Sequence, residues 1–175
     1  MPDIVAVDTA YSADKAVTAG VLVHVWDQAL PEDAFISETA AASEYISGQF
    51  YKRELPCILN FLKEVSWRPD IIIIDGYVFL AENTKGLGQH LYEEMEKTIP
   101  VIGVAKRPFA GNTTALPVYR GLSKRPLYVT AAGISLLEAA QHIKSMYGNY
   151  RIPVILKAVD NLSKNPGLLS TYTRR

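Results

Sequence analysis

The chain has 175 residues, of which 49% are hydrophobic, and this size and composition predict one globular domain over residues 1–175. The 18 Lys and Arg residues balance the 18 Asp and Glu residues, which argues against a protein that coats nucleic acid through overall positive charge. The single cysteine, Cys57, excludes an internal disulfide, and no apolar run approaches the length of a membrane span. We therefore expect a cytoplasmic protein without a membrane partner, and we favour a monomer.

The first forty residues predict an antiparallel meander. Ile4–Asp8 is short, apolar and β-branched, which is typical of a buried strand. A polar turn at Tyr11–Asp14 separates it from the valine-rich segment Ala16–Trp26, so the two segments predict a hairpin. Phe35–Thr39 is the candidate for a third antiparallel strand.

The rest of the chain predicts alternating helices and strands. Apolar residues recur with helical spacing over Glu54–Val65, and four isoleucines at positions 71–74 predict a strand covered on both faces. The further predicted helices are Leu87–Lys97, Ser135–Met146 and Pro153–Leu162, and the further predicted strands are Pro100–Ala105 and Leu127–Thr130. This order indicates an α/β fold with a mixed sheet, an antiparallel meander followed by parallel strands, and helices on both faces.

Three acidic residues stand at positions where carboxylates form sites. Asp8 and Asp75 each end an apolar strand, and Glu54 opens a predicted helix, where its charge would also face the helix dipole. If the three converge, they repel one another unless a cation lies among them, and Mg²⁺ prefers such oxygen ligands. Taken singly, an Asp at a strand end is often a turn residue, and a Glu at a helix start is often only a dipole contact.

Five segments resemble, in family order, the sequence motifs of the endonuclease V family. Pro69–Gly76, for example, resembles the family's "PDLILVDG", and Pro100–Lys106 resembles its "PTIGVAK". The other three segments are Ala6–Tyr11, Glu44–Glu54, which resembles "PYIPGFLxFRE", and Pro126–Thr130, which resembles "PLYVS". We identify the chain as a divergent member whose N-terminus is shorter than is usual in the family.

The resemblance implies a ribonuclease-H-like fold and a metal-dependent endonuclease with Mg²⁺, or Mn²⁺, as cofactor. It implies hydrolysis of a phosphodiester in DNA or RNA near a deaminated base such as inosine, in nucleic-acid repair. Asp8, Glu54 and Asp75 match the metal-binding acids, and Lys106 matches a lysine near the scissile phosphate. The implied substrate-binding residues are Tyr45 and Ile46, on a wedge beside a flipped base, together with Gly48, Arg53 and Gly76. The alternative is that these residues have no role in the reaction. Lys106 would then be a solvated lysine, Tyr45 a surface aromatic side chain and Arg53 only a neighbour of Glu54.

The sequence departs from the family in the expected base pocket. The "HPR" triplet is replaced near Ala81–Asn83, Val78 stands where a second glycine is expected, and Ala131–Ile134 lacks the usual histidine. His90 remains, and we expect it to pack structurally. These losses keep open a ribonuclease-H-like module that binds nucleic acid but cuts weakly or not at all. The zero net charge also keeps open a protein that acts on no nucleic acid.

Overall fold

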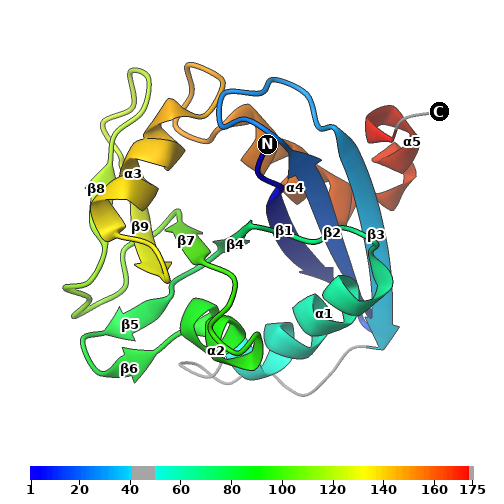
Figure 1. The fold of residues 1–175 in the computed structure, drawn as a ribbon, viewed down its shortest axis with the longest axis horizontal. Helices are drawn as coiled ribbons and strands as arrows, with labels where there is room; N and C mark the ends of the chain where they lie inside the picture. The colour runs from blue at the N-terminus through cyan, green and yellow to red at the C-terminus, as the bar shows by residue number, and fades with distance from the viewer. Residues whose placement is uncertain (41–49, 174–175) are drawn as a thin grey trace.

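A seven-stranded sheet forms the centre of the computed structural model, which describes residues 1–40 and 50–173. Tyr45, Ile46 and Gly48 therefore lie outside the described residues. The strand order is β3-β2-β1-β4-β7-β9-β8, and a separate hairpin holds β5 and β6 (Figure 1). The strands are β1 Ile4–Tyr11, β2 Lys15–Val23, β3 Asp33–Ala40, β4 Ile71–Asp75, β5 Phe79–Ala81, β6 Thr84–Lys85, β7 Val101–Ala105, β8 Leu116–Val118 and β9 Leu127–Ala132. The helices are α1 Phe50–Glu64, α2 Leu87–Glu94, α3 Leu136–Ser145, α4 Val154–Lys164 and α5 Leu169–Tyr172, with a 3₁₀ turn at Pro166–Leu168.

The pairing of the strands confirms the predicted mixed sheet. β1, β2 and β3 form an antiparallel meander, and β1, β4 and β7 run parallel to one another. β9 is antiparallel to both β7 and β8, so the sheet does not end in parallel strands. A parallel return needs a crossover, usually a helix, and the chain between β7 and β9 contains only β8.

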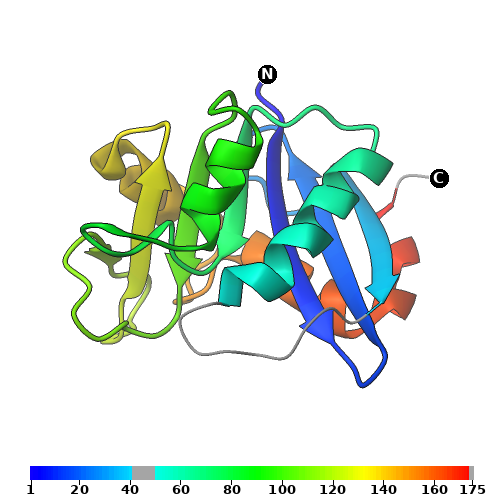
Figure 2. The ribbon, with the colours of Figure 1, turned by 90° about the horizontal axis from the view of Figure 1, so that it is seen from below.

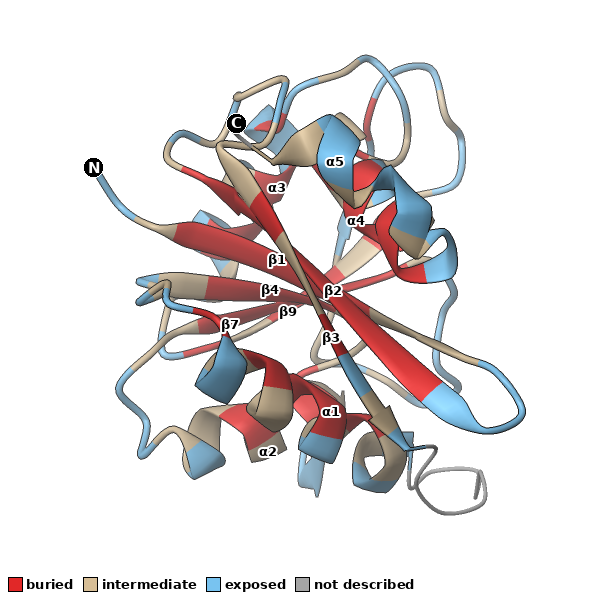
Figure 3. Cartoon of the chain, turned by 90° about the vertical axis from the view of Figure 1, so that its right-hand side faces the viewer, coloured by how far each residue is buried: buried red, intermediate tan, exposed pale blue. Residues whose placement is uncertain are grey.

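Helices cover both faces of the sheet, as the isoleucine run predicts. Ile72 and Ile74 pack with α1 and α2, whereas Ile73 packs with α3 and α4 on the other face. The same alternation runs through β1, because side chains along a strand point to opposite faces. Figure 2 shows α1 and α2 in front of the sheet, and Figure 3 shows buried segments on the strands and on the helix sides that meet them.

The packing of α1 onto the sheet depends on a glycine. The ring of Phe61, on α1, is fully buried over Gly20 of β2. A Cβ built on Gly20 would come within 2.2 Å of the Phe61 Cζ atom, far inside van der Waals contact. This glycine therefore lets α1 pack closely on β2, the neighbour of the strand that bears Asp8.

Several element boundaries differ from those that the sequence predicts. α1 begins at Phe50, so Glu54 lies beyond the first turn, and the expected contact with the helix dipole is wrong. α2 ends at Glu94, earlier than predicted, and Glu96 and Lys97 follow with φ of 56° and 58°. Pro153 precedes α4 as its N-cap, and the short strands β5, β6 and β8 have no counterpart in the prediction. Among the described residues, no helix has the length and apolar character to cross a bilayer.

Candidate active site

Two of the predicted acids lie side by side at one edge of the sheet. β1 and β4 are parallel neighbours, and Val7 is in register with Ile74, so Asp8 and Asp75 follow at adjacent positions. Both carboxylates line a small cavity of about 30 Å³ together with Asp160 of α4 and Lys106, the residue after β7. A cavity of that size holds about one water molecule or one ion. The parallel pairing of β1 and β4 therefore brings Asp8 and Asp75 together, and Asp160 of α4 and Lys106 border the same cavity.

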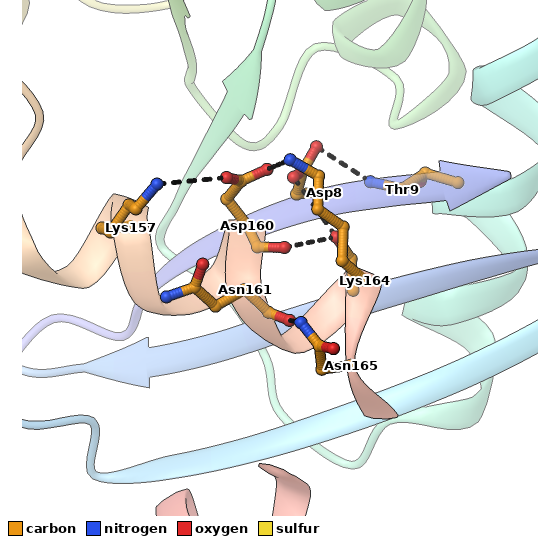
Figure 4. A network of polar contacts seen from close by, with 8 residues as sticks. Asp8, Thr9, Lys157, Asp160, Asn161, Lys164 and Asn165 are labelled. Carbon is orange, nitrogen blue, oxygen red and sulfur yellow. Dashed lines mark hydrogen bonds and ion pairs between the residues drawn. The ribbon is translucent and has the colours of Figure 1, made fainter. Parts of the chain in front are cut away.

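Hydrogen bonds and ion pairs fix two of these carboxylates (Figure 4). The Thr9 backbone N–H donates to Asp8 Oδ1 at 3.0 Å, and the Ser163 hydroxyl donates to Asp8 Oδ2 at 3.3 Å. Asp160 pairs with Lys164, whose Nζ lies 3.0 Å from Oδ1, and more distantly with Lys157, 3.9 Å from Oδ2. Lys164 therefore forms the shorter of the two ion pairs to Asp160.

Burial and mutual repulsion make the cluster unfavourable when all of its members are ionised. Burial raises the pKa of Asp8 to about 7, with further contributions from the Asp75 charge and from a hydrogen bond shared with Asp160. Burial also raises the pKa of Asp75, which the Lys106 ammonium opposes. The pKa of Glu54 is raised well above its usual range by burial first and then by the charges of Asp8 and Asp75. A bound cation would relieve this repulsion.

Glu54 approaches the cluster from a different direction. It is buried on α1, which packs on the opposite face of the sheet from α4, and it does not line the small cavity. Among residues 1–40 and 50–173, no three acidic, histidine or cysteine side chains are placed to hold one metal ion as they stand. The donor chemistry nevertheless suits a hard divalent cation, because every candidate ligand is a carboxylate oxygen. A cation bound among the carboxylates would offset their mutual repulsion and allow them to draw closer together.

Asp160 is a site residue that the sequence reasoning missed. It is 8% exposed and lies on the buried side of α4 among Ile155, Val159 and Leu162. An acidic residue at the helical spacing of apolar core positions was the available signal, because burying a carboxylate without a partner is costly. Arg151 was missed as well. Its Nη2 donates to the backbone carbonyls of Lys106 and, at 2.9 Å, of Pro126, which positions the Lys106 segment.

Two predicted substrate-binding residues lie near the acidic residues of the site. Gly76 follows Asp75 with φ of 140°, and both residues line a neighbouring hollow with Lys106 and Phe109. The guanidinium of Arg53 stacks over the Tyr11 ring at 3.6 Å from its centroid, one residue before Glu54. Arg53 therefore lies at the Glu54 side of the site, where its charge opposes the rise in the Glu54 pKa.

Val78, which stands where a glycine is expected, and His90, which the sequence retains, both make structural contacts. Val78 is fully buried, its backbone N–H donates to the Thr130 hydroxyl at 2.8 Å, and its side chain packs close to Gly88 of α2. His90 stacks on Tyr51 of α1, with ring centroids 3.7 Å apart. Val78 therefore points into the core, and His90 joins two helices.

Comparison with known proteins supports the resemblance seen in the sequence. The family model for endonuclease V matches residues 2–124 of this chain. Endonuclease V of Trichormus variabilis is 26% identical over 93% of this chain and 82% of its own length. Endonuclease V of Azotobacter vinelandii is 30% identical over 68% of this chain and 62% of its own length.

Solved structures show the same fold. The endonuclease V of Streptomyces avermitilis superposes with a TM-score of 0.73 and 24% identity, over 97% of this chain and 82% of that one. A Ciona intestinalis endonuclease V superposes with a TM-score of 0.75 and 19% identity, over 94% and 85% of the two chains. That protein was crystallised with a 24mer DNA that contains an inosine followed by a ribo-adenosine. With the family model matched over most of its length and a ribonuclease-H-like fold in common with these structures, the chain belongs to the endonuclease V family.

Proposed function

We propose that this protein is a Mg²⁺-dependent endonuclease that hydrolyses phosphodiester bonds in DNA or RNA near a deaminated base such as inosine, as part of nucleic-acid repair. The observation that carries the proposal is the cavity beside β1 and at the ends of β4 and β7, which Asp8, Asp75, Asp160 and Lys106 line. Membership of the endonuclease V family supports the nuclease activity. We further propose that the protein works in the cytoplasm, as a single domain and as a monomer.

The residues of the cavity divide into ligands and a phosphate contact. Asp8, Asp75 and Asp160, with Glu54 at the side, would hold Mg²⁺ or Mn²⁺ through their oxygens. When bound, such a cation lowers the pKa of a water molecule and neutralises charge that develops on the leaving oxygen. The Lys106 ammonium lies beside the acids and would bind a non-bridging phosphate oxygen, where an added positive charge stabilises the transition state.

The proposed substrate is a strand whose damaged base leaves the stack. The Ciona relative binds DNA that contains inosine, which supports a similar substrate here. Inosine pairs weakly, so flipping it out of a duplex costs less than flipping an undamaged base. We propose Tyr45, Ile46, Gly48, Arg53 and Gly76 as the residues that contact the strand and the displaced base.

The test is cleavage of matched DNA and RNA oligonucleotides that contain inosine, uracil or a mismatch, with Mg²⁺ or Mn²⁺. We expect cutting next to inosine, and we expect Asp75→Asn to lower the rate by about a hundredfold or more, because it removes a charged ligand but keeps the shape. Asp70→Asn is the matched control. Asp70 is exposed and precedes β4, at the opposite end of the strand that carries Asp75.

Two outcomes would refute the proposal. One is the absence of cutting on every substrate in the presence of either cation, which would instead support a module that only binds nucleic acid. The other is an equal loss of rate in Asp70→Asn and Asp75→Asn, which would show that cleavage does not depend on the carboxylate cluster.

A further inference from the structure

The zero net charge conceals a strong separation of charge along the chain. Residues 1–96 contain 16 of the 18 acidic residues but only 6 of the 18 basic residues. From residue 97 to the end there are 12 basic residues and 2 acidic ones, Glu138 and Asp160. Because Asp160 lines the carboxylate cavity, Glu138 is the one other acidic residue that accompanies the 12 basic residues in this part of the sequence.

Much of that positive charge collects at the β8 end of the sheet. Figure 1 places β8, β9 and α3 together at this end, far from α5. Lys124 and Arg125 are exposed in the connection between β8 and β9, and Lys144 is exposed at the end of α3. In the part of the chain that the structure describes, none of these three side chains forms an ion pair. We call Lys124, Arg125 and Lys144, together with Arg107 and Arg151, the basic surface.

The basic surface is continuous with the active site through Arg151. The Arg151 side chain donates to the backbone carbonyl of Lys106 in the cavity and, through Nε at 3.2 Å, to the carbonyl of Arg125. The guanidinium of Arg120 in turn reaches the Arg151 carbonyl at 3.5 Å. A strand bound at Lys106 therefore has a short, positively charged route towards the connection between β8 and β9.

A groove on this end of the molecule carries exposed aromatic rings. Tyr119, Tyr147 and Tyr150 line it and are 55%, 50% and 69% exposed, and we call it the tyrosine groove. Lys144 and the buried Arg120 also line it, and Asp27 is its acidic lining residue. Arg120 holds its wall in shape by donating to the carbonyls of Met146, Gly148 and Tyr150.

We propose that the basic surface and the tyrosine groove bind single-stranded nucleic acid that extends from the active site. Cations contact phosphates without regard to sequence, and exposed tyrosine rings can stack unpaired bases. A duplex would offer this surface phosphates but no free base faces, so the three tyrosines favour a single strand. The inference rests on the proposed function for the idea that a strand reaches Lys106.

The test measures binding of an unmodified, fluorescently labelled single strand in EDTA, by anisotropy over a range of NaCl concentrations. Because the strand has no inosine and the buffer has no metal ion, the result does not depend on cleavage. Lys124→Gln/Arg125→Gln should weaken binding about tenfold at low salt. It should also reduce the slope of log K against log salt by about 1.4, since each phosphate contact on a single strand contributes about 0.7.

The control for charge is Lys63→Gln/Arg68→Gln, which removes two exposed cations from the region around the end of α1 and should leave binding unchanged. For the tyrosine groove, Tyr147→Leu/Tyr150→Leu should weaken binding about fivefold or more, and Tyr147→Phe/Tyr150→Phe should restore it, because stacking needs only the ring. Thermal melts of each variant check that the fold is retained.

Three results would overturn the inference. Binding by Lys124→Gln/Arg125→Gln at the wild-type level would show that the basic surface is not used. Tighter binding of duplex than of single strand, with no effect of the leucine variants, would exclude stacking in the tyrosine groove. Equal competition by polyglutamate of matched charge would indicate an acidic polypeptide as the ligand. Cleavage of inosine substrates in any of these cases would leave the proposed function intact.

Discussion

At the scale of single residues, the ammonium group of Lys164 forms an ion pair with the acidic cluster. Its Nζ lies 3.0 Å from Asp160 Oδ1, and its pKa is raised by the hydrogen bond to Asp160 first and then by the charges of Asp160, Asp8 and Asp75. Lys164 thus provides part of the positive charge that the carboxylates need in the absence of a metal ion. A divalent cation that binds Asp160 competes with Lys164 for the negative charge of this carboxylate.

We therefore expect Lys164→Met to strengthen Mg²⁺ binding by about two- to fivefold, since an exposed ion pair is worth at most about 1 kcal/mol. The measurement is the rise in melting temperature with Mg²⁺ concentration, which reports the affinity of the folded state. Lys63→Met serves as the control, because Lys63 is exposed on α1 and forms no ion pair in the described part of the chain. Unchanged or weaker Mg²⁺ binding by Lys164→Met would contradict competition at Asp160.

The closeness of Asp8 and Asp75 can be predicted from the sequence because it follows from their positions along the strands. Asp8 and Asp75 each follow a run of apolar residues in neighbouring parallel strands. Asp75 ends its strand as predicted, whereas β1 continues past Asp8, its predicted end, to Tyr11. Asp160 is harder to predict, because its one signal is an acidic residue at the spacing of the apolar core positions in a sequence that otherwise indicates an ordinary amphipathic helix. The burial of Val78 against Gly88 could not be predicted from the sequence either, because it depends on how α2 packs on the strands.

At the scale of elements, α1 and α2 are joined by the stacked rings of Tyr51 and His90. Burial lowers the pKa of His90, with Lys85 acting in the same direction and Glu93 and Glu94 opposing it. The folded state therefore favours the neutral imidazole. As pH falls through the ordinary value of about 6.5, the unfolded chain takes up a proton more readily than the folded one, and stability decreases.

We expect His90→Phe to remove this contribution, because phenylalanine keeps the stack but cannot be protonated. The free energy of unfolding, measured by urea titration at pH 7.5 and pH 5.5, should fall less for His90→Phe than for the wild type. Tyr51→Leu, which exposes the imidazole, should reduce the pH dependence in the wild type but have no such effect in His90→Phe. Identical pH dependence in the wild type and His90→Phe would refute the role of the stack.

The elements that the sequence predicts correctly are those with a strong local pattern. The meander and the isoleucine strand are confirmed, and α3 begins after Ser135, whose hydroxyl accepts from the Glu138 backbone N–H. β5, β6 and β8 contain only two or three residues each, too few to show an alternation of apolar and polar residues. β9 is antiparallel to β7 because of the chain's route through β8, which periodicity does not encode.

At the scale of the whole molecule, the separation of charge affects how copies of the protein interact with one another, whether or not a ligand is bound. Residues 1–96 are predominantly acidic and the remainder is predominantly basic, while the total charge is zero. Two copies therefore have no net repulsion, and the basic surface of one can face the acidic part of another. The screening length is about 30 Å at 0.01 M salt and about 10 Å at 0.1 M, so this attraction should act mainly at low ionic strength.

We expect static light scattering to show weak attraction between copies at low salt and its loss as NaCl is added. Lys124→Gln/Arg125→Gln should reduce the attraction, because it removes positive charge from the basic surface. Lys63→Gln/Arg68→Gln changes the net charge by the same amount but removes positive charge from the acidic part of the chain, so it increases the charge separation. The two double variants should therefore differ, with the stronger attraction in Lys63→Gln/Arg68→Gln. Equal scattering by both would mean that net charge alone governs the interaction, and that the charge separation in sequence does not produce opposed surfaces on the folded protein.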